Sequence, residues 1–190
     1  VIDPCCEQGN PNLVGEESFN VEGGIGFIND ILNAELMGFY RQVDNLIGIT
    51  YDLAEYPDGF IINTPEKVTM WGGEAVVTAK LTENLGGTLD WTHTEAKPAG
   101  SDLQLVNIPR DLVKVILNAQ TTDGRFGGSA SLNWVGDIYA NVPTGRVNYG
   151  NYAVVDLSAF AFVDDDHRHR IGLRLENALD ADYDTSVGRF

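Results

Sequence analysis

The sequence is poor in basic residues. Lysine and arginine together number 12, against 28 aspartate and glutamate residues, so the formal net charge is −16 over 190 residues. A surface that binds nucleic acid needs clustered lysine and arginine, and the chain has only one short basic cluster, at residues 168–170. We therefore expect no nucleic-acid partner.

The sequence also has no long apolar run. Its most apolar stretch, residues 153–163, is interrupted by Asp156 and Ser158, whereas a membrane-spanning helix needs about 20 apolar residues. This excludes a helical membrane protein but not a transmembrane β-barrel, whose strands alternate and give a weak hydropathy signal. The chain opens with Val1 and shows no signal peptide, so we interpret it as a mature form or, preferably, as a fragment of an exported protein.

Cysteine and catalytic motifs are scarce. Cys5 and Cys6 are adjacent, an arrangement that strains a disulfide between them, and two cysteines are too few for a typical zinc site. Either one of them pairs with a cysteine outside this chain or both are inert or free thiols. The sequence contains no nucleophile–base motif and no phosphate-binding loop. We therefore expect no enzyme activity, no catalytic residues and no cofactor.

Period-two alternation is the dominant positive signal. It runs through eight segments, at residues 17–28, 31–43, 67–81, 85–94, 113–120, 125–134, 152–163 and 170–176. Alternation of this kind predicts β-strands with one apolar face. Most of the segments are about ten residues or longer, whereas strands in soluble proteins usually have about five or six. The pattern predicts an all-β fold of antiparallel up-and-down transmembrane strands.

The connections between these strands are alternately short and long. Short turns are expected at residues 29–30, 82–84, 122–124 and 164–167. Longer segments are expected at residues 1–16, 48–66, 97–107, 137–151 and 178–190. Bacterial outer-membrane barrels have short turns on the periplasmic rim and long loops outside, so we place the long segments outside. His93 then lies near the outer rim and His167 and His169 at the periplasmic rim, which argues against a shared metal site.

Aromatic residues gather near the ends of the predicted apolar face. The long-loop half carries Phe19, Tyr40, Trp71, Trp91 and Trp134, and the short-turn ends carry Phe27 and Phe126. Aromatic girdles at both interfaces are typical of membrane barrels because an amphipathic ring suits the headgroup region. The opposite face is polar and rich in glycine, which indicates a wide lumen rather than a barrel packed with its own side chains.

Several motifs resemble those of TonB-dependent receptors. Residues 9–22, with Asn-Pro-Asn-Leu followed by Glu16, Ser18 and Glu22, resemble the family's NPNL.PE.S…E.G segment. Residues 36–47 (LMGFYRQVDNLI) resemble the strand that follows it. Residues 155–157 (VDL) and 175–183 (LENALDADY) resemble the family's late vDl and v.NLfD..Y elements.

The resemblance implies an outer-membrane barrel of 22 strands closed by an N-terminal plug. Residues 1–190 would be part of that single barrel domain, without the plug and the final strand. It implies energy-coupled uptake through TonB of a scarce nutrient such as a ferric siderophore, haem, cobalamin or a glycan. The implied partners are outer-membrane lipid, TonB and the plug through the missing part, and a small-molecule or metal-chelate cargo. A plug-free passive porin is the alternative, and a soluble or surface-displayed β-sandwich for adhesion is a third.

The segment from Ile49 to Thr64 is the candidate for cargo contacts, because loops on a rigid scaffold carry recognition. It offers mixed aromatic and acidic side chains, namely Tyr51, Asp52, Glu55, Tyr56, Asp58 and Phe60. Such groups suit a sugar or a cationic chelate, or they cap a solvated loop. Only Lys97, Arg110 and Arg146 add positive charge nearby, which disfavours an anionic cargo. No metal-binding residues are expected.

Overall fold

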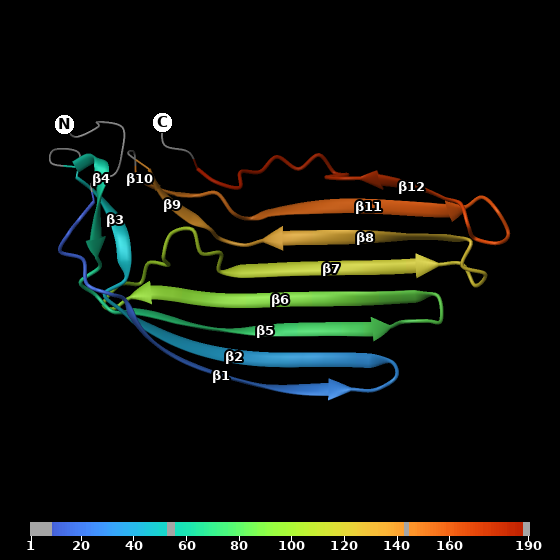
Figure 1. The fold of residues 1–190 in the computed structure, drawn as a ribbon, viewed down its shortest axis with the longest axis horizontal. Helices are drawn as coiled ribbons and strands as arrows, with labels where there is room; N and C mark the ends of the chain where they lie inside the picture. The colour runs from blue at the N-terminus through green and yellow to red at the C-terminus, as the bar shows by residue number, and fades with distance from the viewer. Residues whose placement is uncertain (1–8, 53–55, 143–144, 188–190) are drawn as a thin grey trace.

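The computed structural model describes residues 9–52, 56–142 and 145–187, and these residues form twelve strands and no helix (Figure 1). The strands are β1 (Glu17–Ile28), β2 (Leu32–Asp44), β3 (Ile47–Asp52), β4 (Tyr56–Asn63), β5 (Val68–Lys80), β6 (Leu85–Pro98), β7 (Asp111–Gln120), β8 (Phe126–Val135), β9 (Tyr139–Val142), β10 (Gly145–Asn148), β11 (Tyr152–Phe162) and β12 (Arg170–Leu175). Nowhere in the described part is there a helix both long enough and apolar enough to cross a bilayer.

Eight long strands form one antiparallel sheet in the order β1-β2-β5-β6-β7-β8-β11-β12. These are the eight strands that the alternation predicts, so the all-β, up-and-down prediction is confirmed. A β-sandwich would need two packed sheets of long strands, whereas here all eight lie in one. Successive long strands are neighbours throughout, as an up-and-down barrel wall requires.

The register aligns the predicted faces across the whole sheet. One row of directly opposed residues on the apolar face runs through Ile25, Leu36, Ala75, Trp91, Val113, Trp134 and Ala153. A slip of one residue between any two strands would move one strand's apolar set to the other face. The hydrophobic pattern therefore excludes slips by an odd number of residues, and the short turns fix the rest of the register; the sheet thus has one apolar face and one polar face.

The apolar face is exposed to an unusual degree. Ile25 is 76% exposed and Leu173 is 75% exposed. The buried apolar residues of the described part are few, and they are Val43, Val68, Ala96, Ile138 and Ala140. All of them lie at the end of the sheet that carries the long connections, so the sheet below has no core of its own. An exposed apolar surface of this extent requires an apolar environment.

Short turns lie at one end of the sheet and long connections at the other, as predicted (Figure 1). The long connections predicted at residues 48–66 and 137–151 carry the β3–β4 and β9–β10 hairpins, which the alternation did not predict. Each hairpin pairs only with itself. Local backbone hydrogen bonds therefore order both connections outside the main sheet.

The chain after β12 covers part of β11. β12 has six residues and pairs only with Leu157–Phe162. Beyond it, the Ala178 amide donates to the Val155 carbonyl (2.7 Å), and the ring of Tyr183 stacks on that of Tyr152 with centroids 4.7 Å apart. The other edge of β12 and one edge of β1 remain unpaired within the described sheet.

Candidate functional site

Five of the six predicted cargo-contact residues belong to the strands of the β3–β4 hairpin at the long-connection end. Glu55 lies outside the described residues, as do the side chains of Tyr51, Asp52, Tyr56 and Asp58. Their backbone places Tyr51 and Asp52 in β3 and the other two in β4, with Asp52 opposite Tyr56 and a register shift between Thr50 and Asp52. Phe60 is half-buried on β4. The hairpin thus brings five of the six positions into two paired strands.

Asn63 anchors the base of this hairpin. Its side-chain amide donates to the carbonyls of Asn45 (2.8 Å) and Val14 (3.0 Å), and its Oδ1 accepts from the Val14 amide (2.9 Å). The Glu16 carboxylate accepts from the Ile47 amide (2.7 Å). The segment that precedes β1 is therefore tied to the hairpin base, which fixes where the hairpin leaves the sheet. The sequence alone gave no signal for Asn63, because its partners lie 18 and 49 residues away.

The connection between β6 and β7 covers an exposed strand edge. β6 runs past the start of β7, whose first residue, Asp111, pairs with His93. The buried side chain of Gln104 fills the gap, because its Oε1 accepts from the Ala96 amide (2.9 Å) and its Nε2 donates to the Thr94 carbonyl (3.0 Å). The Gln104 amide group therefore imitates a neighbouring strand and satisfies backbone groups that would otherwise be open to pairing.

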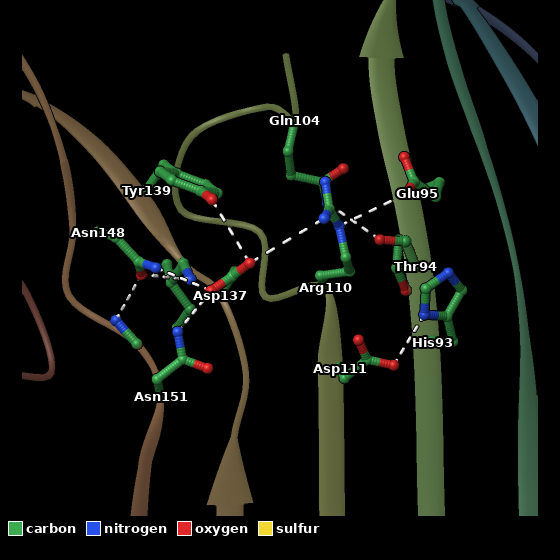
Figure 2. Close-up of polar contacts among 12 residues, drawn as sticks. His93, Thr94, Glu95, Gln104, Arg110, Asp111, Asp137, Tyr139, Asn148 and Asn151 are labelled. Atoms are coloured by element: carbon green, nitrogen blue, oxygen red, sulfur yellow. Dashed lines mark hydrogen bonds and ion pairs between the residues drawn. The ribbon is translucent and has the colours of Figure 1, made fainter. Parts of the chain in front are cut away.

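Asp137 is the centre of a second set of contacts, shown in Figure 2. Its carboxylate accepts from the side-chain amides of Asn148 (2.8 Å) and Asn151 (2.5 Å) and lies 4.0 Å from the Arg110 guanidinium. These hydrogen bonds from Asn148 and Asn151 hold the pKa of the Asp137 carboxyl below its ordinary value, and the Arg110 charge acts in the same direction. One carboxylate therefore links the start of β7, the β8–β9 connection and the segment that enters β11.

The three cations near the predicted cargo loop all have partners. Lys97 lies 2.7 Å from Glu95, and Arg110 lies 3.4 Å from the same carboxylate. Arg146 donates to the Gln104 carbonyl and lies over the Tyr139 ring at 4.4 Å. These charges therefore hold the long connections together, and we call the resulting network of residues 93–111, 137–142 and 145–151 the rim network.

The predicted girdle residues lie on the apolar face. Phe19, Phe27, Tyr40, Trp71, Trp91 and Phe126 are exposed there, and Trp134 is half-buried. Their role at a membrane interface stays a prediction. Trp71 and Trp91 flank His93 at ring-centroid distances of 6.0 and 6.2 Å.

The three histidines are divided between the two ends of the sheet. At the long-connection end, a hydrogen bond of 2.7 Å joins Nδ1 of His93 to the Asp111 carboxylate. His167 stacks on Phe162 and His169 lies 3.5 Å from Asp164, both near the turn between β11 and β12. Among the residues that the structure describes, no three His, Cys, Asp or Glu side chains gather into a metal-binding group.

The polar face is hollowed near β1, β2 and β5. A cavity of about 380 Å³ there is lined by residues that include Met37, Phe39, Met70, Glu22 and Glu74. Apolar and charged side chains therefore share this part of the polar face.

Comparison with known proteins gives a consistent result. The sequence family described as "TonB dependent receptor-like, beta-barrel" matches residues 7–178. The Vitamin B12 transporter BtuB of Photobacterium profundum is 27% identical over 177 residues, which are 93% of this chain and 28% of that protein.

Solved structures agree on the fold. The pyoverdine outer membrane receptor FpvA from Pseudomonas aeruginosa superposes with a TM-score of 0.76 at 19% identity, over 98% of this chain and 29% of that one. The ferric yersiniabactin uptake receptor FyuA from Yersinia pestis gives 0.72 at 18% identity, over 90% and 26%. The copper transporter OprC gives 0.73 at 17% identity, over 92% and 28%. The chain thus spans less than a third of each of these relatives.

Proposed function

Because the chain belongs to the TonB-dependent receptor β-barrel family, we propose that it forms part of the barrel wall of an outer-membrane receptor for energy-coupled nutrient uptake. The observation that carries the proposal is the family match over residues 7–178, on a single eight-stranded antiparallel sheet. The chain itself is one segment of the barrel domain, and it contributes no catalytic step. Energy reaches the receptor through TonB, which contacts a part of the protein outside this chain.

The exposed apolar face supports the membrane location. Under this proposal it contacts the lipid of the outer membrane, with the long connections outside the cell and the short turns in the periplasm. The two aromatic groups then mark the two interfaces. In β8, Trp134 and Phe126 are eight residues apart, and a tilted barrel strand advances about 2.5 Å per residue along the membrane normal. They are therefore separated by about 20 Å, close to the height of roughly 25 Å that an outer-membrane apolar band has.

The polar face supports a filled lumen rather than an open pore. The cavity lined by Met37, Phe39 and Met70 would expose thioether and aromatic surface to water in a passive porin. A plug domain inside the barrel would cover it. We therefore favour a plugged receptor over the passive porin.

The cargo is a scarce small molecule or metal chelate. Cobalamin is the first compound to test, because the B12 transporter BtuB is similar over 93% of this chain. The similar solved structures have different cargoes by their names, a pyoverdine, a ferric yersiniabactin and copper, so ferric siderophores, haem, copper and glycans are tested beside it. The β3–β4 hairpin is the proposed contact region, through Tyr51, Asp52, Glu55, Tyr56, Asp58 and Phe60.

The test measures uptake by the full-length receptor in a strain that lacks its own copy. We expect uptake of one of these compounds to require the receptor and to disappear when the tonB gene is deleted. Uptake that persists without TonB and after collapse of the proton gradient would identify a passive porin instead. The full-length gene gives an independent check, since an energy-coupled receptor needs a plug domain ahead of the barrel.

The hairpin assignment has its own control. Tyr51→Ala and Tyr56→Ala should each raise the Kd of the bound cargo about tenfold, the usual scale for an aromatic contact residue. Thr82→Ala, in a turn at the opposite end of the sheet, should leave the Kd unchanged. Equal Kd values for all three variants would exclude the hairpin as the cargo contact.

A further inference from the structure

A second cavity lies on the polar face near the short-turn end. Its volume is about 230 Å³, and four strands contribute its lining, which includes Asn118, Gln120, Ser129, Ser158, Phe160 and Arg170. The register places Asn118 opposite Ser129 and Ser129 opposite Ser158. The cavity therefore belongs to the inner wall of the proposed barrel, at the end opposite the β3–β4 hairpin.

A stack of three residues fixes the cation in this cavity. Gly127 is opposite Phe160, and a Cβ atom added to Gly127 would lie 2.5 Å from the Phe160 ring. Only glycine leaves room for the ring to lie flat on the β8 backbone. Arg170 in turn lies over the Phe160 ring, with its Cζ 4.0 Å from the centroid. The ring contact restrains the guanidinium, and a cation held on an aromatic ring can still donate its N–H groups to a ligand.

The lining offers hydrogen-bond donors and no carboxylate. The Ser129 and Ser158 hydroxyls are 2.7 Å apart, and since only one of them can donate to the other, the second keeps a free O–H donor. Asn118 and Gln120 add amide donors. Within the described part of the chain, Arg170 forms no ion pair, whereas Arg174 on the same strand pairs with Glu176 (3.1 Å).

We propose that this cavity binds a carboxylate group, supplied by an aspartate or glutamate side chain of the plug that fills the lumen. A guanidinium matches a carboxylate through two parallel hydrogen bonds, and the contact with Phe160 restrains this one. The inference rests on the proposed function, since it needs a plugged barrel. A carboxylate of a passing cargo is the other source of the same chemistry, but the cavity lies far from the cargo hairpin and is open only to what already fills the lumen.

The consequence is a fixed contact between the plug and β7, β8, β11 and β12. Once the plug covers the cavity, water is excluded and the charged hydrogen bonds become stronger. Release or movement of the plug must break this contact. Arg170 is therefore a positioning residue for the plug.

The source of the carboxylate can be identified by cross-linking in the full-length receptor. In an Arg170→Lys variant, a water-soluble carbodiimide joins the lysine amine to a carboxylate in contact with it as an amide, and mass spectrometry locates the joined residue. We expect a plug aspartate or glutamate, with and without cargo. Arg174→Lys is the matched control on the same strand and face, and it should join to Glu176. A cross-link to a cargo carboxylate alone, or no cross-link beyond the control, overturns the assignment to the plug.

A second experiment tests the contact by removing the guanidinium, without introducing an amine for cross-linking. Arg170→Gln should raise the rate of urea-induced plug release about tenfold, as expected for the loss of a charge-assisted hydrogen bond, while Arg174→Gln should not. An unchanged release rate in a receptor that still transports its cargo through TonB overturns this inference alone. A full-length protein with no plug would instead overturn the proposed function.

Discussion

Arginine substitutions on the apolar face test the orientation of the wall. In β8, Ala130 lies four residues from Phe126 and four from Trp134, so it marks the midplane if these two rings mark the interfaces. Leu117 of β7 lies directly opposite Ala130 and is 43% exposed. Strand tilt displaces directly opposed residues of neighbouring strands by only about 3 Å in depth. Leu117 is therefore the deep position and Leu132, two residues from Trp134, the shallow one.

The expected magnitudes follow from depth. Leu117→Arg should lower the free energy of unfolding by about 2–4 kcal/mol, the cost of an arginine near the midplane of a barrel membrane. Leu132→Arg lies about 5 Å from the outer aromatic ring by the same strand geometry, and we expect a smaller loss of about 1–3 kcal/mol. Ser131→Arg, on the polar face between Ile116 and Asp156, should change it by less than about 0.5 kcal/mol.

The assay is a urea titration of the full-length receptor refolded in lipid vesicles, with the folded fraction read from the heat-modified band shift on a gel. Equal losses at Leu117 and Ser131 would show that the two faces are assigned wrongly. A larger loss at Leu132 than at Leu117 would leave the faces intact but refute the depth assignment. The three variants therefore test the assignment of the two faces and the assignment of depth separately.

Three further predictions concern the rim network and the inner wall. Asp137 has a lowered pKa, so its contribution to stability is complete above its ordinary pKa of 3.8 and is lost as the pH falls through the lowered value; the hydrogen-exchange protection factors of residues 136–151, which are corrected for the slower intrinsic exchange at low pH, should fall between pH 5 and pH 3, and Asp137→Asn should show low protection factors at both pH values. Gln104→Ala should destabilise the packing of residues 99–110 on β6 by about 1–3 kcal/mol, because two buried backbone groups lose their partners, and limited proteolysis should then cut this connection first. Gly127→Ala should cost about 1–3 kcal/mol through overpacking against the Phe160 ring, and adding Phe160→Leu should recover part of that loss in the same urea titration; no recovery would show that the ring is not what the new methyl group meets.

The long strands could be predicted from the sequence because each carries a full period-two pattern. Residues 17–28 and 126–135 alternate over ten or more positions, and one face carries only apolar residues and glycine from Phe19 to Phe27 and from Phe126 to Trp134. Alternation also narrows the choice of register to slips of an even number of residues, since every strand must place its apolar set on the same side. The need to cover one face of the sheet therefore adds information about strand pairing that the β-propensities of single residues do not contain.

The hairpins and the rim network could not be predicted in this way. β9 and β10 have four residues each, too few for a periodic signal, and Pro57 and Gly59 interrupt the pattern of β4. Gln104 and Asp137 act through backbone groups and amides that are brought close only by the sheet. Neither residue lies in a strand, and their partners are set by how each connection folds back on the end of the sheet, so no local sequence motif predicts them.

The buried residues at the long-connection end have a consequence for how the wall comes apart. Val43 packs beside Val68, directly opposite it in the sheet, and Ala96 is fully covered. This packing holds in water, whereas under the proposed membrane location the strands toward the short turns rely on lipid to cover their apolar face. When detergent or lipid is withdrawn, loss of structure should therefore start at the short turns and travel toward the long connections, and the long-connection end should be the last part of this wall to melt.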